Sequence, residues 1–450
     1  MAGIAVVGAM ALPSAVAAAE KTYTYKIPIS VASYEVKQGF LTGPKPDVDG
    51  YVTKMETDLV DANGERIPIR RLMLHHIVFL NSANLDTTCE RFRFWDNQSI
   101  FEPAGERFYA AGEERAKMRL PDGYGYPIKA GDPNWGIVYM FMNHRAKDDT
   151  GFVQYRVTVD DDPAIKPVKP HWLDARNCRA DPVYNVPGDG GKASTHVKKT
   201  NYLMPASGRI VAGLGHAHGG ARKLTITRPK CSNRPVAESV PTWGKGSHSF
   251  YEVRPILHEP GPIHMTAFRS QTGIPVRKGE KIRLNSRYEN SMPHVRVMGI
   301  FVVYVAEDAS VAQKCQGLPK DMETVKTKRK GRKGPIPYEI PLTGFKNGKA
   351  VDVKAPPGGL EDLKGRKLDV VDRVFLQPNV RVDRGTKLKW KFRSQELHNV
   401  TLANGPAAVA GPNLDGGRVF ERRLREPGTY RFFCSLHPTD MIQRVKVERR

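Results

Sequence analysis

Residues 428–441 have the sequence GTYRFFCSLHPTDM, and this stretch decides the fold of the C-terminal part of the chain. Its first half is rich in aromatic residues and follows a turn-forming Pro-Gly, which predicts a strand that ends at Cys434. His437 and Met441 follow in the next loop, and His398 comes after another expected strand at residues 387–392. Two imidazoles, one thiolate and one thioether are the ligands of a blue-copper centre. The pattern therefore predicts a type 1 copper site made of these four side chains.

Residues 336–450 as a whole resemble the cupredoxins, copper proteins built on a Greek-key β-sandwich. The spacing of two residues between Cys434 and His437 is typical of that family. The resemblance implies that His398, Cys434 and His437 are equatorial copper ligands and that Met441 is the axial one. It also implies a domain that carries one electron at a time.

The rest of the chain carries short runs of β-branched and aromatic residues between turns, with 41 Gly and 34 Pro in 450 residues and no long helical period. This pattern is typical of antiparallel sandwiches. It predicts an all-β protein in which two antiparallel β-sandwich domains are followed by the cupredoxin sandwich. Turn-rich and charged breaks place the front domains at residues 20–185 and 186–317, with a basic linker at 318–335 before the C-terminal domain.

Two pairs of histidines stand out in the front half. His75 and His76 lie inside an apolar run at residues 72–80, where neighbours point to opposite faces of a strand, so shared metal ligation requires a twist or bulge. His216 and His218 follow an expected strand at residues 210–214 and share one face, so they can chelate a metal directly. A buried core pair or a surface coincidence is the alternative for each pair taken alone.

The order of these pairs, with His144 between them and Met298 after them, resembles the copper type II, ascorbate-dependent monooxygenases. That family includes the peptidylglycine hydroxylating and dopamine β-monooxygenases, and the resemblance covers residues 25–315. It implies two sandwiches that each hold one type 2 copper across a wet cleft, with ascorbate or another one-electron reductant. Carried over by motif, the resemblance implies that the site that accepts electrons is formed by His75, His76 and His144. It implies that the catalytic site, which binds O2 and attacks a C–H bond, is formed by His216, His218 and Met298.

Three positions depart from the peptide-amidating members of that family. Those members carry an Arg two residues before the H-x-H pair, where this chain has Leu214, and polar contacts after the ligand Met, where it has Ile300 and Val302. The expected substrate is therefore an apolar small molecule and not a peptide carboxylate. Met292 and His294 lie close to Met298 and compete with it for the ligand role.

The chain is basic, with a formal net charge of +23 from 70 Lys and Arg against 47 Asp and Glu. These residues are scattered, and no zinc-finger, RRM or KH pattern is present, so we expect no nucleic-acid partner. The densest run, Lys326–Lys333, is followed by Gly and Pro, which indicates a solvated linker; the alternative is a contact with anionic envelope polymers. No internal stretch approaches the ~18 apolar residues of a transmembrane segment.

Export is predicted from the N-terminus and the cysteines. Residues 1–19 are apolar and end in three alanines, as a signal peptide does, although a buried helix is the alternative. Five cysteines leave four once Cys434 is assigned to copper, and four cysteines allow three pairings. The pairing Cys89–Cys178 and Cys231–Cys315 keeps each bridge within one expected domain. We therefore expect a secreted, periplasmic or cell-envelope protein.

Three functions fit these observations. The first is a copper-dependent monooxygenase that hydroxylates a C–H bond with O2 and draws electrons through its fused type 1 domain or from a redox partner protein. The second is a copper-binding or storage protein without turnover, and the third is an electron-transfer protein. A multicopper oxidase is disfavoured because the chain has one H-x-H pair and no His-Cys-His triplet.

Overall fold

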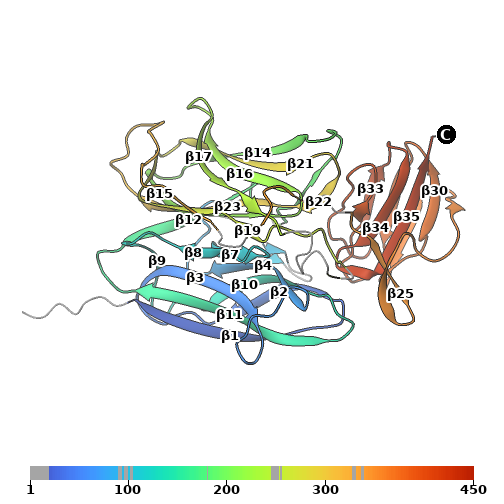
Figure 1. Ribbon diagram of the computed structural model, residues 1–450, viewed down its shortest axis with the longest axis horizontal. Helices are drawn as coiled ribbons and strands as arrows, with labels where there is room; N and C mark the ends of the chain where they lie inside the picture. Colours follow the sequence, from blue (N-terminus) through green and yellow to red (C-terminus); the bar gives the residue numbers. More distant parts are fainter. Residues whose placement is uncertain are drawn as a thin grey trace, which may run out of the picture.

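The structure, a computed structural model, describes residues 20–89, 94–95, 100–101, 105–179, 181–244, 253, 256–326, 331–335 and 339–449. These residues form strands and turns, so the predicted all-β class is confirmed, and none of them lies in a helix that could cross a bilayer. The expected signal peptide and the centre of the basic run lie outside the described residues. Figure 1 shows two stacked β bodies with the C-terminal body, coloured red, beside them.

The first body is a sandwich of two sheets whose facing side chains alternate with exposed ones along each strand. In β11, every second residue from Asp149 is buried, as the period of a strand with one face in the core requires. Its core is strongly aromatic and includes Phe79, Phe108 and Trp135, which are fully buried. The first sheet contains, in order, β1 (Lys21–Val31), β11 (Asp149–Asp160), β3 (Gly50–Val60) and β9 (Tyr124–Ile128), with β8 (Lys117–Arg119) beside β3. The second sheet contains, in order, β2 (Val36–Gly43), β10 (Trp135–Asn143), β4 (Leu72–Asn81) and β7 (Glu106–Gly112).

The second body is also a sandwich, and it includes a strand from within residues 20–185. That strand, β12 (Lys166–Asp174), pairs along its length with β23 (Gly299–Glu307). The same sheet continues with β15 (Gly208–Ala217), β20 (Ala267–Val276) and β24 (Glu323–Val325). The facing sheet contains, in order, β14 (Thr195–Leu203), β21 (Lys281–Glu289), β16 (Ala221–Arg228) and β17 (Arg234–Ser239). Two small ladders pair β13 (Tyr184–Val186) with β22 (His294–Val297) and β18 (Pro241–Thr242) with β19 (His264–Met265).

The two sandwiches are packed tightly against each other. Strands β9 and β12 pair in parallel, which joins the sheets of both bodies into one ten-stranded sheet. β23 is apolar on both faces, and Ile300, Val302 and Tyr304 on its outer face enter the core of the first sandwich. The Tyr304 hydroxyl donates to the Phe108 carbonyl at 2.8 Å. Along β23, the two sandwiches are therefore joined through a buried apolar face and are not separated by an open cleft there.

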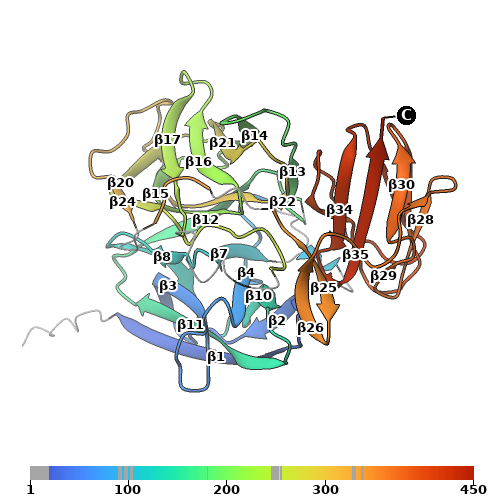
Figure 2. The ribbon, with the colours of Figure 1, turned by 45° about the vertical axis from the view of Figure 1, so that its right-hand side comes forward.

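The C-terminal body is a smaller sandwich with its own core around Trp390, Phe432 and Val445. A hairpin that precedes it reaches the first sandwich (Figure 2). There the centroids of the Tyr34 and Phe345 rings lie 5.9 Å apart. The strands are the hairpin β25 (Leu342–Lys346) and β26 (Lys349–Val353); the sheet of β27 (Glu361–Asp362), β30 (Asn379–Asp383), β35 (His437–Glu448), β34 (Gly428–Cys434) and β32 (Thr401–Asn404); and the sheet of β29 (Val374–Phe375), β28 (Lys367–Val371), β31 (Lys387–Phe392) and β33 (Val419–Arg423). The two-residue strands β5 (Phe94–Trp95) and β6 (Ile100–Phe101) form a separate pair.

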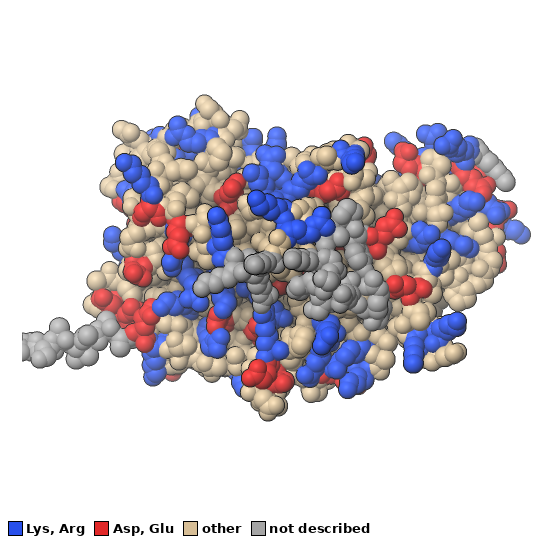
Figure 3. Space-filling view, in the orientation of Figure 1, with Lys and Arg blue, Asp and Glu red and all other residues tan. Residues whose placement is uncertain are grey.

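Both predicted disulfides are confirmed. Cys89–Cys178 ties the loop after β4 to the segment after β12, and Cys231–Cys315 ties the turn after β16 to the segment after β23. Cys434 remains a free, buried thiol. On the face drawn in Figure 3, Lys and Arg side chains are spread over all three bodies and alternate with Asp and Glu, so the charge excess is dispersed there.

Candidate metal centres

A bulge in β4 turns His75 and His76 to the same side. Along the β4–β10 ladder, Met140 is opposite His76 and the next residue, Phe141, is opposite Leu74, so His75 is the extra residue. The two imidazole rings lie with their centroids 4.0 Å apart. The irregularity that shared ligation required is therefore present at the predicted place.

His216 and His218 at the end of β15 meet this bulge across the junction of the two sandwiches. The Nε2 atom of His76 lies 3.1 Å from Nε2 of His216 and 2.9 Å from Nε2 of His218. The His75 and His218 rings are 5.3 Å apart. These residues were predicted to belong to two separate copper sites. The tight packing of β15 and β23 on the first sandwich brings both pairs into one group, the four-histidine centre.

Two neighbouring glutamates orient this centre, and the sequence analysis missed both. In the turn after β7, Glu113 Oε1 lies 2.7 Å from Nδ1 of His75, and Glu114 Oε2 lies 3.0 Å from Nδ1 of His216. Both carboxylates are buried, and a Cβ on the preceding Gly112 would lie only 2.7 Å from the His216 ring. A carboxylate on the outer nitrogen fixes a ligating histidine and leaves Nε2 for the metal. A pair of adjacent acidic residues closing an apolar run was the available sequence clue.

The electrostatics favour neutral imidazoles in most of the centre. Burial lowers the pKa of His75 to about 3 and holds the pKa of His76 and His218 well below the usual value. For His216, burial opposes the charge, but Glu114 outweighs it and raises the pKa. A neutral imidazole has a lone pair available for a transition metal. The three histidines whose pKa is lowered are therefore in the protonation state that metal ligation requires.

A second group lies beside the first and includes His258, which the sequence analysis also missed. His258 Nε2 is 3.0 Å from Sδ of Met73 and 3.3 Å from Oε1 of Glu113. The rings of His258 and His75 are 4.5 Å apart. His258 lies in an irregular segment between β18 and β19, where no periodic pattern marks a ligand, so the sequence offered little to identify it.

His144, the third histidine predicted for the first copper site, is buried in the turn after β10. It is 3% exposed, and neither of its ring nitrogens has a hydrogen-bond partner among the described residues. Burial lowers its pKa to about 3, and the neighbours that lower the pKa further are His258 and His75. The predicted sharing of one metal ion by His75, His76 and His144 stays a prediction.

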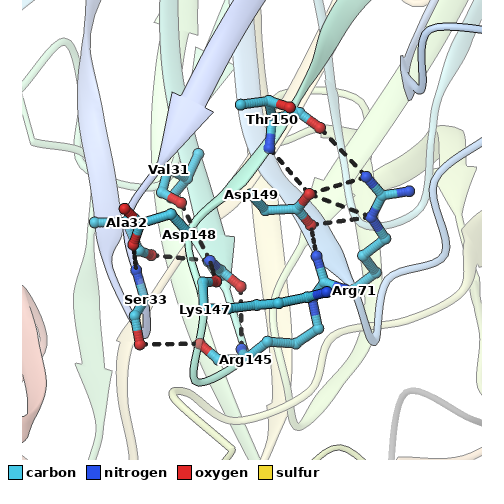
Figure 4. A network of polar contacts seen from close by, with 10 residues as sticks. Val31, Ala32, Ser33, Arg71, Arg145, Lys147, Asp148, Asp149 and Thr150 are labelled. Atoms are coloured by element: carbon cyan, nitrogen blue, oxygen red, sulfur yellow. Dashed lines mark hydrogen bonds and ion pairs between the residues drawn. The ribbon is translucent and has the colours of Figure 1, made fainter.

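A polar network holds the turn that carries His144. Figure 4 shows Arg71 and Arg145 both paired with Asp149, and Arg71 Nη2 approaches Oδ1 of this carboxylate to 2.9 Å. The side chain of Asn143 donates to the carbonyls of Val31, Ala32 and Lys147 at 2.8 to 3.1 Å. The imidazole of His144 is therefore presented from a fixed backbone.

Met298 and its competitors take different places. Met298 lies between β22 and β23, where its carbonyl accepts from the Tyr288 hydroxyl at 2.5 Å, and its side chain and that of Met292 line the same cavity as the four-histidine centre. His294 is instead buried between Glu259, at 2.8 Å from Nδ1, and Glu289, at 3.2 Å from Nε2. These carboxylates outweigh burial and raise the pKa of His294 to about 10, so it is a charged structural residue.

The predicted ligands of the C-terminal body come together at one end of its sandwich. Nδ1 of His437 lies 3.1 Å from Nδ1 of His398 and 3.7 Å from Sγ of Cys434, and Met441 is fully buried nearby in the same core. Asn399 couples the two loops, because its Oδ1 accepts from the Ser435 backbone at 2.9 Å and its own N–H points to Sγ at 3.4 Å. Such second-layer hydrogen bonds fix a copper thiolate.

Comparison with known proteins identifies this domain. Residues 367–448 match the family model of copper binding proteins of the plastocyanin/azurin family. Amicyanin-alpha of Methylorubrum extorquens is 30% identical over 89 residues, which is 19% of this chain and 71% of the relative. In its C-terminal domain, the chain belongs to the plastocyanin/azurin family. Solved structures of amicyanin variants share 28% identity with the plastocyanin/azurin domain and cover 19% of this chain and 82% of theirs, with a TM-score of 0.18.

The front half has more distant relatives. Residues 174–308, which include His216, His218 and Met298, match the family model "Stress up-regulated Nod 19". A "Probable copper-dependent oxygenase M1" of Phoma sp. is 25% identical over 248 residues, which is 48% of this chain and 62% of that protein. The chain thus spans less than two thirds of the length of this relative.

One cavity of about 500 Å³ connects all three bodies. The four-histidine centre lies on its wall, and the plastocyanin/azurin domain contributes Leu402, Leu414 and Leu436 to the lining. Arg296 spans the junction: its backbone hydrogen-bonds to the His218 ring, and its guanidinium donates to the Gly411 carbonyl at 3.1 Å. The two candidate metal regions are therefore linked through one residue and one shared cavity.

Proposed function

We propose that this protein is an exported copper-dependent monooxygenase that oxidises a C–H bond of an apolar small molecule with O2, with its plastocyanin/azurin domain as the electron carrier. The observation that carries the proposal is the convergence of His75, His76, His216 and His218 on a cavity that the electron carrier helps to close. The similarity to a probable copper-dependent oxygenase supports it.

The four-histidine centre has the donors that copper prefers, since imidazole suits both of its oxidation states. Copper bound there would supply one-electron redox chemistry and reactivity toward O2. Glu113 and Glu114 would hold the two outer ring nitrogens, and Met298 on the cavity wall offers a thioether. In the C-terminal domain, the ligands would be His398, Cys434, His437 and Met441.

The cavity lining supports an apolar substrate. At the three positions where the peptide-amidating enzymes carry polar substrate contacts, this chain has Leu214, Ile300 and Val302. All three residues line the cavity. Arg107, which also reaches the cavity, is engaged by Asp86 at 2.7 Å. An apolar wall also excludes water from the reacting atoms, which limits side reactions.

Electron supply is the role proposed for the C-terminal domain. Hydroxylation by O2 requires two electrons in addition to those of the C–H bond, and a type 1 copper delivers one at a time. Ascorbate or a redox partner protein would reduce this domain, and Arg296 would connect it to His218. The two disulfides support an exported protein, because such bonds persist in oxidising compartments.

Oxygen consumption by the copper-loaded full chain, with ascorbate as the reductant, tests the proposal. We expect reductant-dependent O2 uptake that falls at least tenfold in His216→Ala. The matched control is His196→Ala, a half-buried histidine on β14 of the same sandwich, which should retain the rate of the unmodified protein. Copper binding without O2 uptake would overturn the proposal in favour of copper storage or simple electron transfer.

A further inference from the structure

Beside the four-histidine centre lies the group of Met73, Glu113 and His258, which neither the motif resemblance nor the comparisons assign as a unit. The buried His144 in the turn after β10 adds a further imidazole, and neither of its ring nitrogens has a partner among the described residues. Met73 and Glu113 are buried, and His144 is 3% exposed. The side chains come from β4, from the turns after β7 and β10, and from the segment before β19. They supply a thioether, a carboxylate and two imidazoles, which are all donors for metals.

Hydrogen bonding fixes the tautomer of His258. Its Nδ1 lies 2.7 Å from the carbonyl of Glu259, and because a carbonyl only accepts, Nδ1 carries the hydrogen. In the neutral ring Nε2 then has a lone pair, and it faces Sδ of Met73 at 3.0 Å and Oε1 of Glu113 at 3.3 Å. Three potential electron-pair donors thus converge on one point, which is the arrangement of a metal site. A cation there would be held by nitrogen, sulfur and oxygen together.

The segment that carries His258 is anchored directly after it. Glu259 forms the ion pair with His294 at 2.8 Å, and the Gly261 N–H donates to Glu113 Oε2 at 2.8 Å. A Cβ at Gly261 would lie 2.6 Å from that carboxylate oxygen, so the close approach requires glycine. The position of His258 is therefore set by contacts that its own side chain does not make, as expected of a preorganised site.

The surroundings of the group are soft and apolar. Met73 packs with Met142, Leu257 and the half-buried Met140 in one cluster. His144, with both ring nitrogens unpartnered, is the independent sign of a missing ligand, because buried polar groups in native proteins are otherwise satisfied. Thioether sulfur and low polarity favour Cu(I) over harder cations.

We propose that Met73, His258 and Glu113, with His144 as a further donor, bind a second front-half copper as Cu(I), adjacent to the four-histidine centre. This inference rests on the proposed function, which places the first copper there. Glu113 Oε1 contacts both His75 Nδ1 and His258 Nε2, at 2.7 Å and 3.3 Å, so one carboxylate connects the two centres. The front-half coppers then form a close pair instead of two distant sites.

Copper stoichiometry of the full chain, loaded anaerobically with Cu(I) against a chromophoric chelator, tests the inference. We expect three copper ions per chain, and two in Met73→Leu, a volume-conserving change that preserves packing. His258→Gln should also lose one ion. Met118→Leu, at a fully buried methionine in the core of the first sandwich, is the matched control and should keep three. X-ray absorption should show a Cu–S component that is reduced in Met73→Leu and unchanged in Met118→Leu.

The outcomes separate the two proposals. Two copper ions in the unmodified chain, with one lost in His216→Ala, would overturn the second site and leave the proposed function standing. One ion per chain, retained in His216→Ala and lost in Cys434→Ser, would overturn both. Three ions that persist in Met73→Leu and His258→Gln would also overturn this inference, because the third ion would then lie elsewhere.

Discussion

At the scale of single residues, His294 shows how a buried charge supports the site without touching it. Its ring is 2% exposed and lies between Glu259 and Glu289. The same interaction lowers the pKa of Glu289 to about 2 against the effect of burial. Removing one member of a buried ion pair typically costs ~3–5 kcal/mol, because the partner keeps an unpaired charge. The group therefore stabilises the second sandwich and the segment that carries His258.

A pH dependence follows for His294→Gln. Because the folded-state pKa is raised from 6.5 to about 10, the contribution of His294 is complete below pH 6.5 and is lost as the pH rises through 10. The difference in thermal stability between the unmodified protein and His294→Gln should therefore be largest at pH 6 and shrink steadily toward pH 10. Melting curves at several pH values measure it. A difference that stays constant across this range would contradict the assigned charge.

Cys434 is the residue on which the C-terminal site depends. Its side chain is fully buried, and burial raises the pKa of the thiol above its ordinary value despite the Asn399 N–H. A bound metal would reverse this effect, since a coordinating thiol is deprotonated. The thiol is thus poised for a metal and protected from solvent oxidants.

At the scale of elements, the β4 bulge and the turn after β7 act together. The bulge brings both imidazoles of β4 to one side, and Gly112 allows the ring of His216 to approach the turn. Gly112→Ala would place a methyl group 2.7 Å from His216 and 2.9 Å from the His75 carbonyl, and such overpacking costs ~1–3 kcal/mol. We expect Gly112→Ala to weaken copper binding at the four-histidine centre at least tenfold while the plastocyanin/azurin copper remains.

Copper titration followed by EPR, which separates type 1 from type 2 signals, measures the effect of Gly112→Ala. Gly317→Ala is the control, because a Cβ there meets no atom within 4 Å. Equal type 2 affinity in Gly112→Ala and the unmodified protein would show that the turn does not shape the centre.

Some elements of the site were predictable from sequence because their chemistry is local. The Cys-x-x-His spacing and the H-x-H pair each place their ligands through the geometry of one strand and its loop. For adjacent His75 and His76 to share a metal, the strand had to contain a bulge, which the sequence pattern also indicated. The union of the two histidine pairs was not predicted, although β23 is apolar at nearly every position, from Gly299 to Ala306. A strand buried on both faces indicates a layer on each side. His258 could not be found from the sequence, and the adjacent Glu113 and Glu114 were only a clue, because the contacts of these residues with the histidines depend on packing between distant segments.

At the scale of the whole molecule, the C-terminal domain has two roles that mutants can separate. It is the proposed electron carrier, and it lines the cavity through Leu402, Leu414 and Leu436. Cys434→Ser should remove the orange-red charge-transfer band and the electron-carrying function, but the domain should still line the cavity. Removing residues 336–450 should remove both, and the front half retains its own cores.

With excess ascorbate, which reduces the front-half copper directly, we expect Cys434→Ser to retain O2 uptake. The truncated chain should lose most of its uptake under the same conditions, because its cavity is open to water. With a weak protein reductant, both variants should be slow. Equal rates for the truncated and complete chains with every reductant would contradict both roles. An unchanged spectrum in Cys434→Ser would contradict the thiolate assignment.

The meeting of His76 with His216 and His218 joins residues separated by 140 and 142 positions in the chain. During synthesis, His76 therefore emerges long before its partners exist, and a nascent first sandwich has only half of the centre. The full set of four imidazoles therefore exists only after the second sandwich has docked. A copper ion at the proposed centre would then mark completed assembly, since a chain that is cut short or misassembled would lack half of the ligands.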